Sequence, residues 1–279
     1  MLPNTFIAGV QKCGTTALHH LLGQHPDVFF PRAPQEIHFF DVEKNFRKGL
    51  GWYESLFSDW SGQRVVAQTS PLYLFEPQVP GRIHAVVPHA RFIVILRNPV
   101  DRAYSHYWHE VKHGTEKLSF EDALEREQDR IRQGFEERRH FSYVSRGEYA
   151  SQLSRYLEYF PRERILTLRF EDLAQNVDEL LRRCADFLEV DVGGFTEARR
   201  QHGVRNTARM PRSPLAHSLG RKLGRRFPRL GYAIAHWNLK PTKYEAMKDD
   251  TRKALERRFE DDIRRTASLT GMELGAWLP

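Results

Sequence analysis

The sequence is poor in cysteine and has no long apolar run. Only two cysteines occur among its 279 residues, Cys13 and Cys184, which is too few for a disulfide framework or a cysteine metal cluster. No run approaches the roughly 20 apolar residues that span a bilayer. The first strand-like segment is not preceded by the basic and apolar regions of a signal peptide. We therefore expect a soluble, cytoplasmic protein with no export signal and no integral membrane segment.

Acidic residues are missing from one long stretch. The net charge is +7, and residues 199–230 contain ten Lys or Arg but no Asp or Glu. Such a segment indicates either an anionic partner or a solvated surface segment. Phe227 is its only aromatic residue, so it lacks the stacking platforms of a nucleic-acid binder. We expect no nucleic-acid partner.

Strand-like and helical patterns alternate along the chain. The strand-like runs cover residues 5–10, 63–70, 90–98 and 164–173, and the helical patterns cover residues 15–25, 99–113, 147–160, 176–190 and 242–271. This order predicts an α/β fold, with helices flanking a central parallel sheet of about five strands. We expect a single P-loop-like domain over residues 1–279, with residues 199–230 forming a basic lid-like segment. Ligands of such sheets bind at the carboxyl ends of the strands.

The segment FIAGVQKCGTTAL, residues 6–18, has the layout of a phosphate-binding loop. Gly9 and Gly14 have the Walker separation, but Thr15 follows the second glycine and the lysine lies inside the loop, at Lys12. The N–H groups of Gly14, Thr15 and Thr16 would point from a helix N-terminus at an anion. The other interpretation is a glycine turn with an ordinary N-cap threonine. We predict a phosphate site.

The strand over residues 90–98 ends differently from that of a kinase. A P-loop kinase holds Mg²⁺ with an aspartate at the end of a later strand, where this sequence has Arg97 and Asn98. An arginine repels a metal and attracts a second phosphate. Arg97 and Ser105 together suit a phosphate monoester, with a bidentate guanidinium and a hydroxyl donor. The pattern favours a ligand with two phosphate groups and no metal.

These two segments, GVQKCGTTALHHLLGQHPDV and RFIVILRNPVDRAYSHYWHE, resemble the 5′-phosphosulfate-binding and 3′-phosphate-binding segments of the sulfotransferases that use 3′-phosphoadenosine 5′-phosphosulfate (PAPS). The stretches APQEIHFFD, GLGWYESLF and TSPLYL are similar to the heparan-sulfate N- and 3-O-sulfotransferase branch. The stretch SRGEYASQLSRYLEYFPRERILTLRFEDL resembles bacterial members. The likeness covers residues 5–188. It implies a metal-independent enzyme that transfers a sulfuryl group from PAPS and releases 3′-phosphoadenosine 5′-phosphate (PAP).

The resemblance also implies which residues bind the nucleotide. The loop around Lys12 would hold the 5′-phosphosulfate, with Lys12 over the bridging oxygen. Arg97 and Ser105 would bind the 3′-phosphate, and Tyr149 would help to enclose the nucleotide. The cofactor-binding residues predicted in this way are Lys12, Cys13, Gly14, Thr15, Thr16, Arg97, Ser105 and Tyr149.

The catalytic residues implied by the resemblance are Lys12, Glu36, His38 and Asp41. Glu36 occupies the position of the general base in the heparan-sulfate enzymes, and His38 and Asp41 match polar residues of the same site. Should Glu36 not be the base, His38 or His109 is the next candidate. The acceptor group would be a hydroxyl, with an amine as the alternative, on a glycan, a glycolipid or a small secondary metabolite.

The sequence departs from the family pattern at three places. Gln68 stands where related enzymes often have an acidic residue, and Thr69 stands where the glycosaminoglycan enzymes have a lysine. The missing lysine weakens the case for a polyanionic acceptor. Those enzymes also have a disulfide-bounded loop late in the chain, where this sequence has the basic segment 199–230. We expect Arg205 or Arg209 to clamp the 3′-phosphate; the alternative is a lid without ligand contacts.

Other functions are consistent with parts of the sequence. A metal-independent nucleotide-binding protein would explain the glycine loop. A kinase-like P-loop protein would also explain it, but the missing metal aspartate and the displaced lysine disfavour a kinase. A non-catalytic polyanion binder would explain only the basic segment. The lack of a membrane anchor separates this chain from Golgi sulfotransferases and indicates a bacterial, cytoplasmic enzyme. Residues 39–50 and 112–145 are candidates for acceptor selection.

Overall fold

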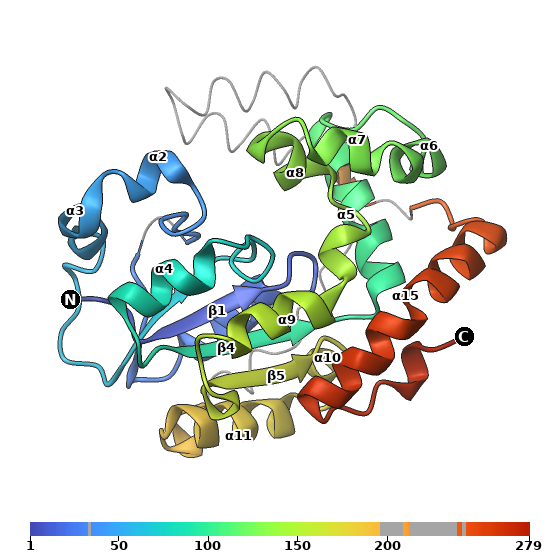
Figure 1. The fold of residues 1–279 in the computed structure, drawn as a ribbon. Coiled ribbons are helices and arrows are strands. Elements are labelled where there is room, and N and C mark those ends of the chain that lie inside the picture. Colours follow the sequence, from blue (N-terminus) through green and yellow to red (C-terminus); the bar gives the residue numbers. More distant parts are fainter. Residues whose placement is uncertain (33–34, 196–208, 212–238, 242–243) are drawn as a thin grey trace. The chain divides into compact units, whose positions relative to one another are not determined.

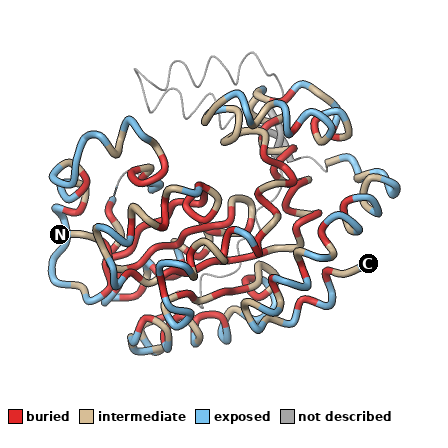
Figure 2. The backbone as a smooth tube through the Cα atoms, in the orientation of Figure 1, coloured by how far each residue is buried: buried red, intermediate tan, exposed pale blue. Residues whose placement is uncertain are grey.

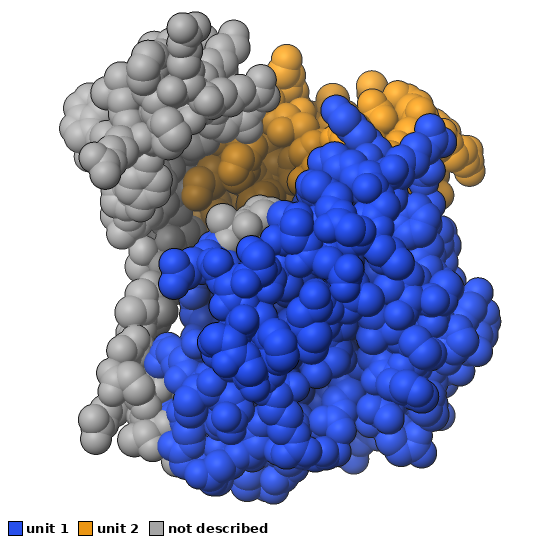
Figure 3. All heavy atoms as spheres, turned by 90° about the vertical axis from the view of Figure 1, so that its left-hand side faces the viewer, with its two compact units in different colours: residues 1–99, 148–203, 259–279 blue, residues 100–147, 204–258 orange. Residues whose placement is uncertain are grey.

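The computed structural model describes residues 1–32, 35–195, 209–211, 239–241 and 244–279 (Figure 1). Contacts within the chain divide it into two compact units (Figure 3). Unit 1 consists of residues 1–99, 148–203 and 259–279, and unit 2 of residues 100–147 and 204–258. The single domain expected over the whole chain stays a prediction, and each unit is described by itself.

Unit 1 contains a five-stranded parallel sheet of order β2-β3-β1-β4-β5. Its strands are β1 (Thr5–Gly9), β2 (Val28–Phe29), β3 (Val65–Thr69), β4 (Arg91–Leu96) and β5 (Ile165–Arg169). The predicted α/β fold with about five parallel strands is confirmed. Sequence patterns identified four of the strands. The fifth, β2, has only two residues, which is too short to leave a periodic pattern.

The core of unit 1 lies on both faces of this sheet. Every residue of β1 and β3 is buried, as are five of the six in β4 (Figure 2). This explains why β4 is a continuous apolar run rather than an alternating one. The rings of Phe6 in β1 and Phe92 in β4 stack with centroids 5.6 Å apart. Packing in the core therefore holds the central strands in position. Their carboxyl ends carry the candidate site residues.

Helices cover the sheet of unit 1. They are α1 (Thr15–Leu22), α2 (Glu43–Phe46), α3 (Gly49–Ser55), α4 (Val79–Val86), α9 (Tyr149–Leu157), α10 (Asp172–Gln175) and α11 (Val177–Leu188), with single turns η2 (Arg162–Arg164), η3 (Val192–Phe195) and η4 (Gly275–Trp277). Tyr156 of α9 packs edge-on against Phe92 of β4 at 5.0 Å between ring centroids. On α11, an apolar stripe that includes Leu181, Cys184 and Leu188 is buried. Both helices thus have the amphipathic pattern that the sequence predicts.

One predicted strand is shorter in the structure. The run over residues 164–173 ends as a strand at Arg169, and α10 begins at Asp172. The Asp172 carboxylate accepts from Arg169 Nη2 at 2.9 Å, and acidic residues favour the first turn of a helix. The chain therefore turns into a helix directly after the sheet edge.

The described part of unit 2 is largely helical. It contains most of α5 (Pro99–His113), followed by α6 (Phe120–Glu125), α7 (Glu127–Ile131), α8 (Phe135–Phe141) and the turn η1 (Ser145–Gly147). Strands β6 (Arg209–Pro211) and β7 (Leu239–Pro241) pair antiparallel. The buried Glu127 carboxylate accepts from the backbone N–H groups of Val144 at 2.6 Å and Ser145 at 2.8 Å. This carboxylate ties α7 to the end of the segment 112–145.

The last helix, α15 (Asp249–Thr270), contributes residues to both units. It begins later than the predicted 242–271, because residues 244–248 are not helical. Asp249 and Asp250 occupy the first turn, where negative charge stabilises a helix. Among the described helices, none combines the length and the apolarity needed to cross a membrane.

Candidate active site

The loop between β1 and α1 is a tight turn that accepts few residue types. Lys12 and Gly14 both adopt left-handed backbone angles, with φ of 73° and 88°, a region that favours glycine. A Cβ on Gly14 would lie 2.5 Å from Cδ1 of Leu173, so any side chain at this position would force Leu173 to move. The Cys13 N–H donates to the Val10 carbonyl at 3.1 Å. Sterics and hydrogen bonding thus fix how the loop leads into α1.

The N-terminus of α1 suits an anion. Gly14 is its N-cap residue, and no side chain in the described part of the chain caps this terminus. Thr15 is buried and Thr16 is exposed. The first amides of a helix carry a partial positive charge that an anion can neutralise. The phosphate site predicted from the sequence would lie at this terminus, and that assignment stays a prediction.

Arg97 lies beside this loop. It follows β4, and its Nη1 donates to the Lys12 carbonyl at 3.4 Å. Its guanidinium lies 4.7 Å from the centroid of the Phe170 ring. The Tyr149 hydroxyl donates to the Arg97 carbonyl at 2.9 Å and lies 4.0 Å from Cys13 Sγ. The structure therefore brings together four predicted cofactor-binding residues. Tyr149 and Cys13 are fully buried, so their side chains pack this loop against the core.

Three other predicted residues are not placed at this loop. Ser105 lies in the part of α5 that belongs to unit 2. Arg209 lies in β6, where only the backbone is described, and Arg205 lies outside the described residues. Their assignment to the 3′-phosphate stays a prediction.

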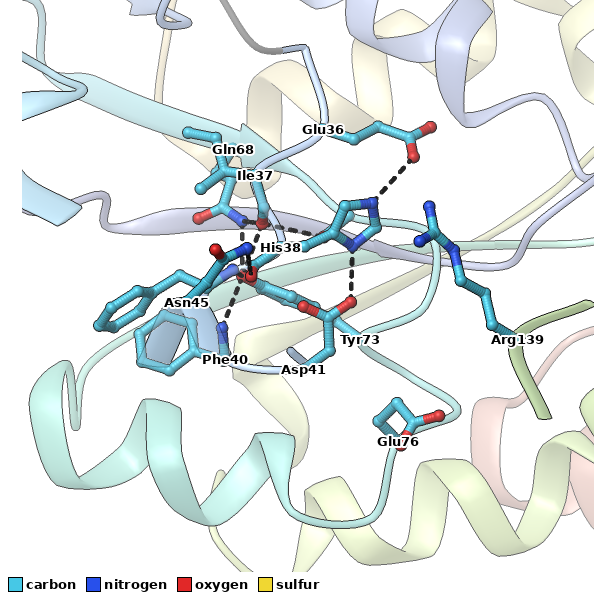
Figure 4. Close-up of polar contacts among 12 residues, drawn as sticks. Glu36, Ile37, His38, Phe40, Asp41, Asn45, Gln68, Tyr73, Glu76 and Arg139 are labelled. Carbon is cyan, nitrogen blue, oxygen red and sulfur yellow. Dashed lines mark hydrogen bonds and ion pairs between the residues drawn. The ribbon is translucent and has the colours of Figure 1, made fainter. Parts of the chain in front are cut away.

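Glu36, His38 and Asp41 form a row of polar side chains before α2 (Figure 4). The His38 Nδ1–H donates to Asp41 Oδ2 at 2.7 Å, and His38 Nε2 lies 3.5 Å from Glu36 Oε2. The exposed fractions of the side chains are 43% for Glu36, 16% for His38 and 0% for Asp41. The row therefore leads from solvent to a buried carboxylate, with Glu36 at the accessible end.

Asp41 determines which nitrogen of His38 faces Glu36. A carboxylate only accepts hydrogen bonds, so the 2.7 Å contact requires a proton on His38 Nδ1. The His38 carbonyl accepts from Asn45 Nδ2 at 2.8 Å, which holds the loop on α2. His38 Nε2 is consequently the nitrogen that can exchange a proton with the Glu36 carboxylate.

A buried hydrogen-bond network fixes the same loop to β3, and sequence reasoning did not find it. Gln68 Nε2 donates to the Ile37 carbonyl at 2.6 Å and to the Tyr73 hydroxyl at 2.7 Å. The Tyr73 hydroxyl also accepts from the backbone N–H groups of Phe39 and Phe40, at 3.3 and 3.2 Å. The bonds to Ile37, Phe39 and Phe40 join residues more than 30 positions apart, so no local pattern marks them. The network holds the backbone on both sides of His38.

The network explains why a glutamine occupies position 68. Its amide oxygen accepts from the Tyr53 hydroxyl while its nitrogen donates to Ile37 and Tyr73. A carboxylate at this position has no donor, so the bonds to the Ile37 carbonyl and the Tyr73 hydroxyl would be lost. Burial raises the pKa of the Tyr53 and Tyr73 hydroxyls well above the ordinary value. Both phenols therefore stay neutral and keep their protons for donation.

Asp262 is a second residue that sequence reasoning missed. Its carboxylate accepts from the N–H groups of Tyr149 at 2.8 Å and Ala150 at 3.1 Å. These amides begin α9, so Asp262 caps that helix from α15. The cap positions Tyr149 beneath the Arg97 backbone.

His19 connects α1 with the strand that pairs with Glu36. Its Nδ1 lies 2.9 Å from Thr69 Oγ1, and Thr69 forms a parallel backbone bridge with Glu36. Burial, and then the neighbouring His20, lower the pKa of His19 to about 4, although the charge of Glu36 acts in the opposite direction. His19 is therefore neutral at pH 7.

We expect His19 to reduce the stability of the protein in acid. The pKa of His19 is about 4 in the folded protein, against an ordinary value of 6.5. Between these values the unfolded chain binds the proton that the folded protein excludes, so the free energy of unfolding falls as the pH drops through this window. His19→Gln keeps a donor for Thr69 and removes the titration. Urea unfolding midpoints should fall less for His19→Gln than for the wild type between pH 7 and pH 4.5.

The control for this comparison is His89→Gln, at an exposed position of unit 1. It should follow the wild type at both values of pH. An equal acid-induced loss in the wild type and His19→Gln would show that His19 does not contribute to it.

Comparison with known proteins agrees with this geometry. The model of the family described as Sulfotransferase domain matches residues 2–208. The mouse heparan sulfate glucosamine 3-O-sulfotransferase 3B1 is 34% identical over 187 residues, covering 67% of this chain and 46% of that protein. The bifunctional heparan sulfate N-deacetylase/N-sulfotransferase of Drosophila melanogaster is 30% identical over 209 residues, covering 68% of this chain and 20% of that protein. The chain thus spans less than half the length of either relative.

A solved structure shares the fold over nearly the whole chain. The sulfotransferase from Alicyclobacillus acidocaldarius matches with a TM-score of 0.75 and 30% identity, covering 99% of both chains. Sequence and fold therefore agree with the predicted resemblance, including its N- and 3-O-sulfotransferase relatives. This chain belongs to the sulfotransferase family of enzymes.

Proposed function

We propose that the protein transfers the sulfuryl group of PAPS to an acceptor hydroxyl, with Glu36 as the general base. The single observation that carries the proposal is the combination, within unit 1, of an uncapped α1 terminus, the Lys12 turn and Arg97. It offers backbone N–H groups and two cations to a ligand with more than one anionic group. PAPS is such a ligand, and when bound it supplies the sulfuryl group and a stable leaving phosphate.

The chain's own residues would act mainly through position and charge. We assign the 5′-phosphosulfate to Lys12 and to the amides of Gly14, Thr15 and Thr16. The charge of Lys12 would stabilise the negative charge that develops on the oxygen released from sulfur. Arg97 contributes a second positive charge at the edge of the same loop.

Glu36 would take the proton from the acceptor hydroxyl as the oxygen–sulfur bond forms. Its side chain is 43% exposed, so an acceptor can reach it. His38 lies 3.5 Å away and is oriented by Asp41. With its Nδ1 proton held, His38 Nε2 can receive that proton from Glu36 and restore the base. Proton transfer by positioned groups of this kind contributes about 10²–10⁴-fold to a rate.

Removing either cation should weaken nucleotide binding. We expect Lys12→Ala and Arg97→Ala each to bind PAP roughly 10- to 100-fold more weakly, because each loses a charge-assisted contact to phosphate. Isothermal titration calorimetry with PAP measures this without any acceptor. Arg182→Ala, an exposed position on α11, should bind PAP like the wild type. Unchanged affinity in both cation variants would refute the donor site.

The transfer itself can be tested with sulfur-labelled PAPS and a fractionated extract of the native cell. A labelled product that forms with the wild type and fails to form with Lys12→Ala supports the proposal. Turnover should be the same with and without EDTA, since the proposed chemistry needs no metal. Turnover of ATP in place of PAPS would instead favour a kinase-like protein.

A further inference from the structure

A groove of about 790 Å³ opens beside α1 in unit 1. The residues used in the following argument all line it: His19, His20, Gln24, Phe30, Arg32 and Gln63. Its volume lies within the range of small-molecule sites, roughly 300–1,000 Å³. The groove is therefore large enough for several linked rings.

His19 connects the groove with the proposed base through Thr69. His19 lines the groove, and its Nδ1 is 2.9 Å from Thr69 Oγ1. Thr69 forms a parallel backbone bridge with Glu36, and the charge of Glu36 acts on His19. A molecule bound in the groove would thus have one of its ends near the Glu36 carboxylate.

The groove also shares a helix face with the donor loop. His20 follows Thr16 by four positions on α1, and both side chains are exposed. Residues four apart lie on the same face of a helix, about one turn or 5.4 Å along its axis. The proposed phosphosulfate site at the start of α1 and the groove near its end are therefore adjacent along one helix.

The lining combines rings with uncharged polar groups. His19 and Phe30 lie with ring centroids 4.1 Å apart, and the His20 ring meets His19 edge-on at 5.5 Å. Gln24 and Gln63 add amides. Ring faces pack against the C–H faces of other rings, and amides bind hydroxyls. This combination suits a molecule that has both apolar faces and many hydroxyl groups.

The lining offers little positive charge. Arg32 is the only lysine or arginine among the described residues that line the groove, and its Nε lies 3.6 Å from the Asp59 carboxylate. Asp59 lines the groove as well, and its charge would repel a sulfate or carboxylate. A polyanionic chain would need several unopposed cations. The groove therefore disfavours an acidic acceptor.

From these observations we propose that the groove binds the acceptor and that the acceptor is an uncharged carbohydrate. The inference rests on the proposed function, because it takes Glu36 as the base and the start of α1 as the donor site. Within that framework, a sugar hydroxyl at the Glu36 end of the groove receives the sulfuryl group and loses its proton to the carboxylate. The remaining rings occupy the groove toward Arg32.

The proposal can be tested by direct binding, independently of turnover. Saturation-transfer NMR would measure maltotetraose, cellotetraose and chitotetraose as neutral probes and a heparin-derived tetrasaccharide as the anionic probe, each with and without PAP. We expect at least one neutral tetrasaccharide to bind the wild type more tightly than the heparin fragment. His20→Ala and Gln63→Ala should each weaken that binding at least 5-fold and leave the PAP affinity unchanged. His89→Ala, at an exposed position outside the groove, should bind like the wild type.

The results separate this inference from the proposed function. If PAP binds but no neutral tetrasaccharide does, or if the heparin fragment binds best, the neutral-acceptor groove is wrong and the transfer reaction stands. Neutral binding that neither groove variant weakens also overturns the groove. If a neutral tetrasaccharide binds at the groove but PAP does not bind at all, the donor assignment fails and the carbohydrate site stands.

Discussion

Glu36→Gln is expected to lower kcat by about 10²–10⁴-fold while the affinity for PAP stays within twofold of the wild type. The substitution keeps the size of the side chain and its place beside His38 Nε2, 3.5 Å away. It removes the only property that the proposed step requires, which is the ability to accept a proton from the acceptor. Single-turnover transfer from labelled PAPS measures the rate, and calorimetry measures PAP binding.

Asp41→Asn distinguishes the contribution of the proposed base from that of the residues that orient its neighbour His38. Asp41 holds His38 Nδ1 at 2.7 Å, so the substitution would disturb the orientation and proton of His38 and leave Glu36 in place. We expect a smaller loss of kcat than for Glu36→Gln. Near-normal turnover in Glu36→Gln together with a large loss in His38→Ala would identify His38 as the base instead.

Gln68→Glu should destabilise the protein by on the order of 3 kcal/mol at neutral pH. Gln68 is 1% exposed, and its amide nitrogen donates to both Ile37 and Tyr73. A carboxylate there would meet the Ile37 carbonyl with no proton to donate. The described hydrogen-bond partners of Gln68 include no cation that would offset its charge. Urea unfolding of the purified variant measures the loss.

The effect of Gln68→Glu should depend on pH in a defined direction. Burial raises the pKa of a carboxyl group above the value near 4.3 that it has in the unfolded chain. Between the two values the folded protein holds the proton and the unfolded chain releases it, so the destabilisation grows as the pH rises. Gln175→Glu, at an exposed position of α10, is the matched control and should cost little. A deficit for Gln68→Glu that is as large at pH 4.5 as at pH 8 would contradict this account.

The sheet could be predicted from the sequence because burial leaves a local signal. The run from Phe92 to Leu96 is wholly buried, and burial on both faces favours a continuous apolar run. The glycine turn before α1 could be predicted for a similar reason, since the left-handed angle at Gly14 favours glycine, which is easily recognised in a sequence. The location of Arg97 could then be predicted as well, because it directly follows the end of β4.

The base loop could not be predicted from physical patterns alone. The stretch around Glu36 has the composition of a surface turn, and only the family resemblance indicated its role. Its geometry depends on Gln68 and Tyr73, whose partners at Ile37 and Phe39 lie more than 30 positions away. Side-chain hydrogen bonds over such separations have no fixed spacing. A folded structure is needed to find them.

Because both cysteines are buried, the rate at which they react with a thiol reagent reports how often the structure opens locally. Cys13 lies in the loop between β1 and α1, with its Sγ 4.0 Å from the Tyr149 hydroxyl, and Cys184 lies on the buried face of α11, where burial raises the pKa of its thiol to about 12. A thiol reagent can reach either sulfur only when the surrounding structure opens. The labelling rate of Cys13 therefore measures how often the loop between β1 and α1 opens, and that of Cys184 measures how often α11 separates from the sheet. A ligand that slows the first rate more than the second stabilises this loop more than it stabilises the core around α11.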